Sequence, residues 1–232
     1  MLKKIKNYRY ERKFVIPSLN LKDFEYYLKV KPLIFNKVYV QRRINNIYFD
    51  SINYNNFFDN ISGNSKRVKP RIRWYGTTFG ILGNPILEYK IKKESLNSKL
   101  SYPLTSFSLN HKLTKNQLDI IWNDLNIPLG VSDYMKNLFP SLLNSYNRKY
   151  YLSACKRYRI TIDDDLLYYK IFGNRILINS KFYEKNNIII ELKYDKKFDE
   201  NADSLAQYLK VRLCKNSKYV NGVLKTNFLM DN

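Results

Sequence analysis

The sequence predicts an α+β fold in which about eight antiparallel strands close into a barrel, with helices packed outside. Segments of alternating apolar and polar residues recur along the chain, and segments with helical spacing separate several of them. The polar positions of the alternating segments repeatedly carry arginine or lysine. If helices cover the apolar faces from outside, the basic faces converge inside the sheet. The predicted barrel is therefore a basic tunnel.

Strands are predicted where residues two positions apart are both apolar or both polar, because such residues point to the same side of a strand. The sequence IFGNRI (171–176) adds a hairpin turn through Gly173 and Asn174, with a short strand on each side. The segments with this alternation are 9–16, 45–50, 69–76, 85–94, 145–154, 156–163 and 186–195.

Helices are predicted between these strands at 18–30, 51–60, 114–125 and 200–213. Ser18 is a candidate cap of the first helix. The chain shows no internal repeat and no glycine-, serine- or proline-rich linker, so we expect residues 1–232 to form a single domain. A hydrophobic content of 44% is sufficient for a core.

The segment KPRIRWYG (69–76) illustrates how the two faces differ. Arg71 and Arg73 point to one side, and Ile72 and Trp74 point to the other. One such strand is explained by an ordinary sheet with a solvated charged face. Recurrence of arginine on many strands instead favours a lumen that holds a polyanion. Buried cations without a partner cost free energy of desolvation, and the guanidinium group of arginine can bind phosphate oxygens through two hydrogen bonds. Trp74 and Trp122 are expected in the core.

The charge balance points to the same class of partner. The chain has 41 basic and 20 acidic residues, a formal net charge of +21. Nucleic acid, an acidic membrane surface and a polyphosphate-type ligand all fit this excess. The two cysteines, Cys155 and Cys214, form no metal or redox motif, and no apolar run is long enough for a signal peptide or a membrane span. We therefore expect a cytoplasmic chain without a membrane anchor.

Eight short motifs of the sequence resemble those of the triphosphate tunnel metalloenzyme (CYTH-like) superfamily. Within it, they are similar to the catalytic domain of the vacuolar transporter chaperone (VTC) polyphosphate polymerases, over nearly the whole chain. The motifs are RYERKF, IYFDS, RIRW, LEYKIKK, YNRKYY, RYRITID, IIELKY and KNSKY, in the order of the family.

The resemblance implies an ATP-dependent polyphosphate polymerase that carries the γ-phosphate of ATP to a growing polyphosphate chain, with Mn²⁺ or Mg²⁺ as cofactor. The residues implied to act on the transferred phosphate are Arg71, Arg73, Lys90, Arg148 and Arg159. Further phosphate-binding candidates are Lys13, Lys215 and Lys218 by resemblance, and Arg157 and Lys193 by their positions on the basic faces. Glu191 is the implied metal ligand, whereas Glu88, Glu11 and Asp163 are candidates for metal binding or for orienting basic side chains.

The sequence also departs from its relatives. Many tunnel triphosphatases begin with two carboxylates and a lysine, but Arg9 occupies the first carboxylate position. The chain has no room for the phosphate-sensing SPX domain or the membrane domain of eukaryotic members, so any membrane partner would be a separate protein.

Two alternatives remain open. The first is a triphosphatase of the same fold, in which water replaces the phosphate acceptor. Arg9 in place of the first carboxylate speaks mildly against it. The same substitution disfavours an adenylate cyclase. The second is a binder of polyanions or nucleic acid without catalysis, which the charge and the 21 tyrosines would suit. No specific nucleic-acid partner is expected, because the basic residues are spread over many strands.

A phosphohistidine mechanism is disfavoured, since the sole histidine, His111, lies in a polar connection.

Overall fold

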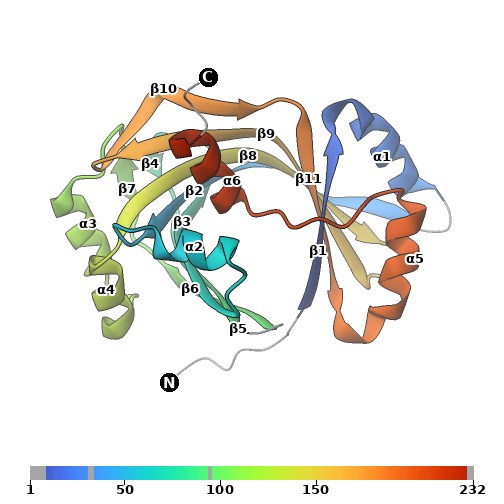
Figure 1. Cartoon of the computed structure of the whole chain (residues 1–232), viewed down its shortest axis with the longest axis horizontal. Helices are drawn as coiled ribbons and strands as arrows, with labels where there is room; N and C mark the ends of the chain where they lie inside the picture. The colour runs from blue at the N-terminus through green and yellow to red at the C-terminus, as the bar shows by residue number, and fades with distance from the viewer. Residues whose placement is uncertain (1–8, 31–33, 94–95, 229–232) are drawn as a thin grey trace. The chain divides into compact units, whose positions relative to one another are not determined.

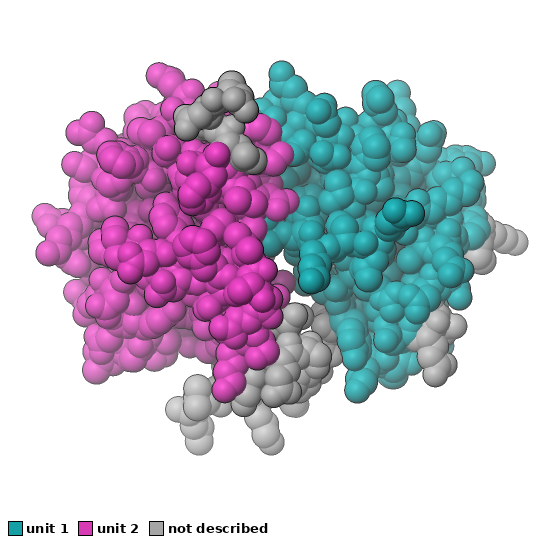
Figure 2. All heavy atoms as spheres, viewed as in Figure 1, with its two compact units in different colours: residues 1–42, 146–166, 183–217 teal, residues 43–145, 167–182, 218–232 magenta. Residues whose placement is uncertain are grey.

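The computed structural model describes residues 9–30, 34–93 and 96–228. The chain divides into two compact units, coloured separately in Figure 2. Unit 1 comprises residues 1–42, 146–166 and 183–217, and unit 2 comprises residues 43–145, 167–182 and 218–232. Several strands begin in one unit and end in the other.

Strands dominate the chain, as the alternating segments predict (Figure 1). The strands are β1 (Arg9–Pro17), β2 (Phe35–Asp50), β3 (Lys66–Tyr75), β4 (Gly80–Leu82), β5 (Ile86–Lys93), β6 (Leu96–Pro103), β7 (Phe107–Leu109), β8 (Phe139–Ser153), β9 (Tyr158–Phe172), β10 (Arg175–Glu184) and β11 (Asn187–Asp195). The helices are α1 (Leu21–Lys29), α2 (Asn55–Ile61), α3 (Lys115–Trp122), α4 (Leu129–Lys136), α5 (Glu200–Tyr208) and α6 (Lys218–Val223), with short helical turns at Ser18–Asn20, Lys196–Phe198 and Leu224–Phe228.

The main sheet has the hydrogen-bonded order β1-β11-β9-β8-β2-β3-β5-β6, and β10 pairs with β9. Strands β4 and β7 form a separate pair. This is an α+β fold with a large antiparallel sheet, so that part of the prediction is confirmed. The pairing order of the described residues ends at β1 and β6, and closure into a barrel is not seen among them.

The apolar core of unit 1 lies on one face of β1, β11 and β9. Phe14 pairs with Ile190, which pairs in turn with Ile162, so three apolar side chains lie in one row across the strands. Helix α1 covers this face with Phe24 and Leu28, and α5 covers it with Ala202 and Leu205. The face of β1, β11 and β9 that points away from these helices is the polar one.

Unit 2 repeats this arrangement with different helices. Ile47 of β2 pairs with Ile72 of β3, which pairs with Leu87 of β5. Trp74 and Trp122 are buried in the same core, as expected from the sequence, together with Leu118 and Ile121 of α3 and Met135 of α4.

The predicted hairpin at residues 171–176 is confirmed between β9 and β10. Gly173 and Asn174 both have positive φ, at 50° and 66°, as a two-residue hairpin turn of right-handed twist requires. The pattern underestimated the strands on either side: β9 and β10 are 15 and 10 residues long.

Helix α6 was not predicted, and its position depends on a glycine. A Cβ atom at Gly222 would lie 2.4 Å from Leu142 Cδ2 and 2.6 Å from Tyr168 Cδ1. Both neighbours are buried, and the tyrosine ring is rigid. Only glycine therefore lets α6 approach β8 and β9 this closely.

No helix in the described ranges is long and apolar enough to cross a membrane.

We predict that Gly222→Ala destabilises the protein by about 1–3 kcal/mol, the usual cost of overpacking a core. The measurement is chemical unfolding followed by circular dichroism. Gly130→Ala is the matched control: this helical glycine has open space around its Cα and no positive φ. The control should be neutral or stabilise by up to about 1 kcal/mol. Equal effects of the two substitutions would contradict the close approach of α6.

Candidate functional site

The polar face of unit 2 is organised around the buried carboxylate of Glu88. Register places Tyr48, Arg71 and Glu88 opposite one another on β2, β3 and β5. Arg71 Nε and Nη2 lie 2.9 and 2.7 Å from Glu88 Oε2, Arg73 Nη1 lies 3.6 Å from the same oxygen, and Lys99 Nζ lies 2.8 Å from Oε1. One carboxylate thus fixes two of the arginines that the sequence singled out.

These cations change the acidity of Glu88. Burial alone would raise the pKa of this carboxyl, but the charges of Arg71, Arg73 and Lys99 together outweigh burial and hold the pKa well below its usual range. Glu88 therefore stays ionised in the folded protein. The contacts of Glu88 with Arg71, Arg73 and Lys99 fit the orienting role among the alternatives that the sequence left open.

A second set of contacts holds Arg71 from the side of β2. Arg71 Nη1 donates to the hydroxyl of Tyr48 at 3.1 Å, and the guanidinium lies 5.8 Å from the ring centroid. The Tyr48 ring stacks on Tyr219 of α6 with centroids 5.0 Å apart. The Tyr219 hydroxyl donates to Asp50, which also accepts from the backbone N–H groups of residues 51, 56 and 57 at 2.8–3.0 Å.

Asp50 therefore links α2, α6 and β2. Its side chain is fully buried, and burial raises the pKa of Asp50 although four hydrogen bonds oppose the change. Burial, together with the neighbouring Asp50, also raises the pKa of Tyr219. The motif IYFDS is visible in the sequence, but the roles of Tyr48, Asp50 and Tyr219 are not, because their partners are far away in the sequence.

The polar face of unit 1 is centred on Arg148 of β8. Arg148 makes a two-point contact with Asp163, with Nε to Oδ1 at 2.5 Å and Nη2 to Oδ2 at 2.6 Å, and Nη2 lies 3.3 Å from Glu191 Oε2. Its guanidinium also lies 5.4 Å from the centroid of buried Tyr146. Burial alone would lower the pKa of Arg148, but Asp163, Tyr146 and Glu191 raise it, so the cation is retained.

Glu191 gathers further cations on this face. Lys193 Nζ lies 2.8 Å from Glu191 Oε2, and Lys13 Nζ lies 3.6 Å from Oε1. Lys13 Nζ is also 3.4 Å from Glu11 Oε1 and donates to the carbonyl of Asn216 at 3.0 Å. Glu11 and Glu191 therefore approach the same ammonium group.

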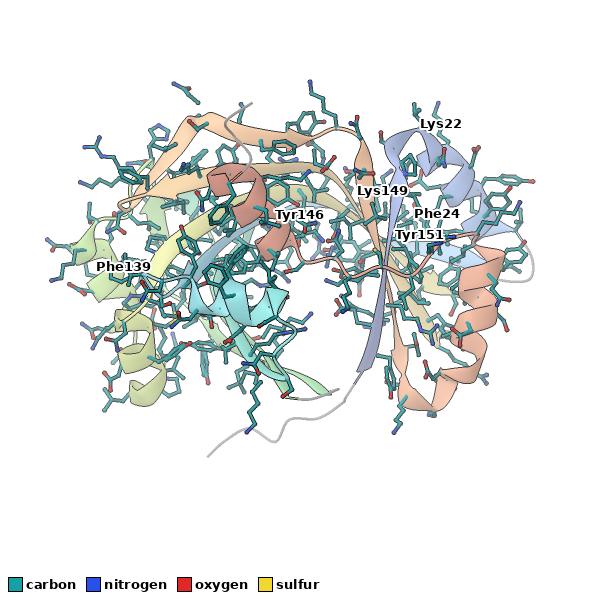
Figure 3. The ribbon with its side chains drawn as sticks, in the orientation of Figure 1. Lys22, Phe24, Phe139, Tyr146, Lys149 and Tyr151 are labelled. Atoms are coloured by element: carbon teal, nitrogen blue, oxygen red, sulfur yellow. The ribbon has the colours of Figure 1, made fainter. Side chains whose placement is uncertain are left out.

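The opposite side of β8 has a different role. Lys149 Nζ and the Tyr151 hydroxyl contact Glu25 Oε1 of α1 at 2.9 and 2.8 Å. Figure 3 shows Lys149 and Tyr151 on the side toward α1, where Phe24 lies. Alternate residues of β8 thus serve the helix-covered face and the polar face.

The other predicted site residues are less enclosed. Arg159 pairs in register with Lys193, is exposed, and makes no ion pair within the described part of the chain. Arg157 is exposed and lies over the ring of Phe198 at 5.0 Å. Lys90 is half-buried, Lys215 is exposed, and Lys218 is buried at the start of α6. Of the predicted residues, three meet in unit 2: Arg71, Arg73 and Glu88. Six meet in unit 1: Glu11, Lys13, Arg148, Asp163, Glu191 and Lys193.

The unit 1 face is suited to a divalent cation bound together with phosphate. The described residues contain no group of three or more histidine, cysteine, aspartate or glutamate side chains that could hold a metal. Mg²⁺, however, is commonly held by one or two carboxylates plus substrate phosphates. Glu191 and Glu11 supply two carboxylates, and the buried Thr161 Oγ1, opposite Glu191 in register, has no hydrogen-bond partner among the described residues. These hard oxygen donors fit Mn²⁺ or Mg²⁺.

Comparisons with known proteins agree with this architecture. Residues 8–227 match the VTC domain family. No curated protein matches the chain. A candidate adenylate cyclase from Vibrio parahaemolyticus superposes with a TM-score of 0.50 at 10% identity, covering 92% of this chain and 96% of that chain. One from Bacillus halodurans gives 0.53 at 12% identity, covering 96% and 98%. These two likenesses concern the fold alone.

We predict that Glu88→Gln destabilises the protein by about 3–5 kcal/mol, because the substitution leaves a buried cation cluster uncompensated. The folded pKa of Glu88 is depressed, so its contribution is complete above the unfolded value of about 4.3 and is lost as pH falls further. Wild type should therefore lose stability below about pH 4 more steeply than the variant, measured by urea unfolding across pH.

Asp133→Asn provides the control. Asp133 is an exposed carboxylate 3.7 Å from Lys136. Its substitution should change stability by less than about 0.5 kcal/mol. If Glu88→Gln matched this control in size and in pH dependence, the assigned role of Glu88 would be wrong.

Proposed function

Since this chain belongs to the VTC domain family, we propose that it is a polyphosphate polymerase, which transfers the γ-phosphate of ATP to the end of an inorganic polyphosphate chain. The family and its superfamily carry phosphate-chain or triphosphate chemistry, and polymerisation is the specific activity proposed. The observation that supports it is the arrangement of arginines held in place by carboxylates. Glu88 holds Arg71 and Arg73, and Asp163 with Glu191 holds Arg148.

The proposal includes the architecture in which this reaction would take place. In it, the chain acts as one domain over residues 1–232, and the sheet closes into a tunnel lined by both polar faces. The transferred phosphate is then surrounded by Arg71, Arg73, Lys90, Arg148 and Arg159. The rest of the phosphate chain is held by Lys13, Lys193, Lys215, Lys218 and Arg157.

Phosphoryl transfer requires in-line positioning and neutralisation of charge. The bond between the γ-phosphorus and the β,γ-bridging oxygen breaks, and a terminal oxygen of the polyphosphate forms a new bond to that phosphorus. ADP leaves with the bonding electron pair on its terminal oxygen. The acceptor oxygen is largely ionised near neutral pH, because the second phosphate pKa is about 6, and no general base is needed. Arginine forks bind the oxygens of the transferred group in two-point contacts.

Glu191 and Glu11 are the residues that would hold a Mn²⁺ or Mg²⁺ ion, while Thr161 Oγ1 is available as a further oxygen donor. When bound, such an ion would neutralise charge on phosphate oxygens. Lys13 lies within 4 Å of both carboxylates and would have to shift toward the phosphate chain.

A cytoplasmic location is part of the proposal. ATP is available there as the donor, and both cysteines are free thiols. A separate membrane protein could receive the product.

The first test is incubation of the purified chain with ATP and Mn²⁺, with ADP, free phosphate and long-chain polyphosphate measured together. We expect ADP and polyphosphate with little free phosphate. Equal amounts of ADP and free phosphate would make the chain a triphosphatase and contradict polymerisation. Absence of turnover with ATP and with tripolyphosphate would favour a non-catalytic polyanion binder.

We predict that Glu191→Gln lowers turnover at least about 100-fold and leaves triphosphate binding measurable, because the amide removes the charge that would hold the metal. Glu25→Gln is the matched control, since Glu25 also pairs with a lysine in unit 1 but lies on the helix-covered face. It should keep its activity. Thermal melts of both variants would show whether either effect comes from unfolding.

A further inference from the structure

A group of two tyrosines and one arginine lies on the polar face of unit 1, next to the Arg148 cluster; Tyr39 and Arg42 are exposed, and Tyr150 is half-buried. Tyr39 of β2 and Tyr150 of β8 meet edge to face, with ring centroids 5.6 Å apart. The guanidinium of Arg42 lies 5.4 Å from the Tyr39 centroid and 5.9 Å from the Tyr150 centroid. None of these residues was singled out by the sequence reading.

The position of Tyr150 follows from the alternation of β8. Lys149 and Tyr151 contact Glu25 of α1, so they lie on the helix-covered face. Arg148 contacts Asp163 and Glu191 on the other face. Tyr150 is two residues from Arg148 and therefore shares its face, roughly 7 Å further along the strand.

Exposure separates this group from three other arginine–tyrosine contacts of the described residues. Tyr146 beside Arg148, Tyr48 beside Arg71 and Tyr194 beside Arg12 are 2–4% exposed, and their rings belong to the packed interior. Tyr39 is 58% exposed. Packing alone leaves most of this ring in water, although the strand places it beside the basic face.

We propose that Tyr39, Tyr150 and Arg42 form the subsite for the base of a purine nucleoside triphosphate. An exposed aromatic ring offers a planar surface on which a base stacks, and an arginine can add a cation–π contact. Arg148, with Lys13 and Lys193 on the same face, binds the phosphates, and the ribose spans the step between the two subsites. That the nucleotide is ATP rests on the proposed function. The base subsite adds a means by which this chain distinguishes ATP from an inorganic triphosphate.

The test compares binding of ATP and of inorganic tripolyphosphate to the full chain by isothermal titration calorimetry. Tyr39→Ala should weaken ATP binding about 5- to 150-fold, the range expected for loss of one stacked base, and leave tripolyphosphate binding unchanged. Tyr39→Phe keeps the ring and should keep ATP affinity within about twofold. Tyr26→Ala, at an exposed tyrosine of α1, is the matched control and should alter neither ligand.

Equal weakening of both ligands by Tyr39→Ala, or no change in ATP binding, would overturn the subsite. So would a wild-type chain that binds tripolyphosphate more tightly than ATP. The proposed function fails in a different way, because a chain that binds ATP through Tyr39 but forms no polyphosphate would keep the subsite and lose the polymerase assignment.

Discussion

Buried carboxylates that hold the arginines are the interaction on which the polar faces depend. Glu88 is 3% exposed among Arg71, Arg73 and Lys99, and Asp163 is fully buried against Arg148. A guanidinium enclosed without a partner would cost several kcal/mol. A carboxylate that occupies one edge of the fork leaves other N–H groups for a phosphate and fixes their direction before any ligand binds.

The register of β1 with β11 places opposite charges next to each other. In unit 1, Lys13 lies opposite Glu191 and Glu11 lies opposite Lys193, which stabilises the pairing of β1 with β11. These few acids neutralise only part of the cationic excess, since the chain has 41 basic and 20 acidic residues. An excess of positive charge of this size raises the local concentration of anions at the surface.

Support for the polar face of unit 2 comes from residues that touch no predicted ligand. Asp50 joins α2 to α6 through Tyr219, and Tyr219 supports Tyr48, which lies against Arg71. Gly222 allows α6 to lie close enough to Leu142 and Tyr168 for this contact. The orientation of one arginine therefore depends on residues that are up to 169 positions apart in the sequence.

The sequence by itself determined most strands of the main sheet, the four predicted helices, the Gly173–Asn174 turn and the side of each predicted strand that carries charge, because alternation and turn chemistry are local properties. It did not reveal β4, β6, β7, α4, α6 or the first half of β2, which are short or have weak periodicity. Only the tertiary structure decided which carboxylate holds which arginine, that Asp50 binds Tyr219, and that Tyr39 meets Tyr150. These contacts join distant strands and helices, and the register that creates them is set by packing of the whole sheet.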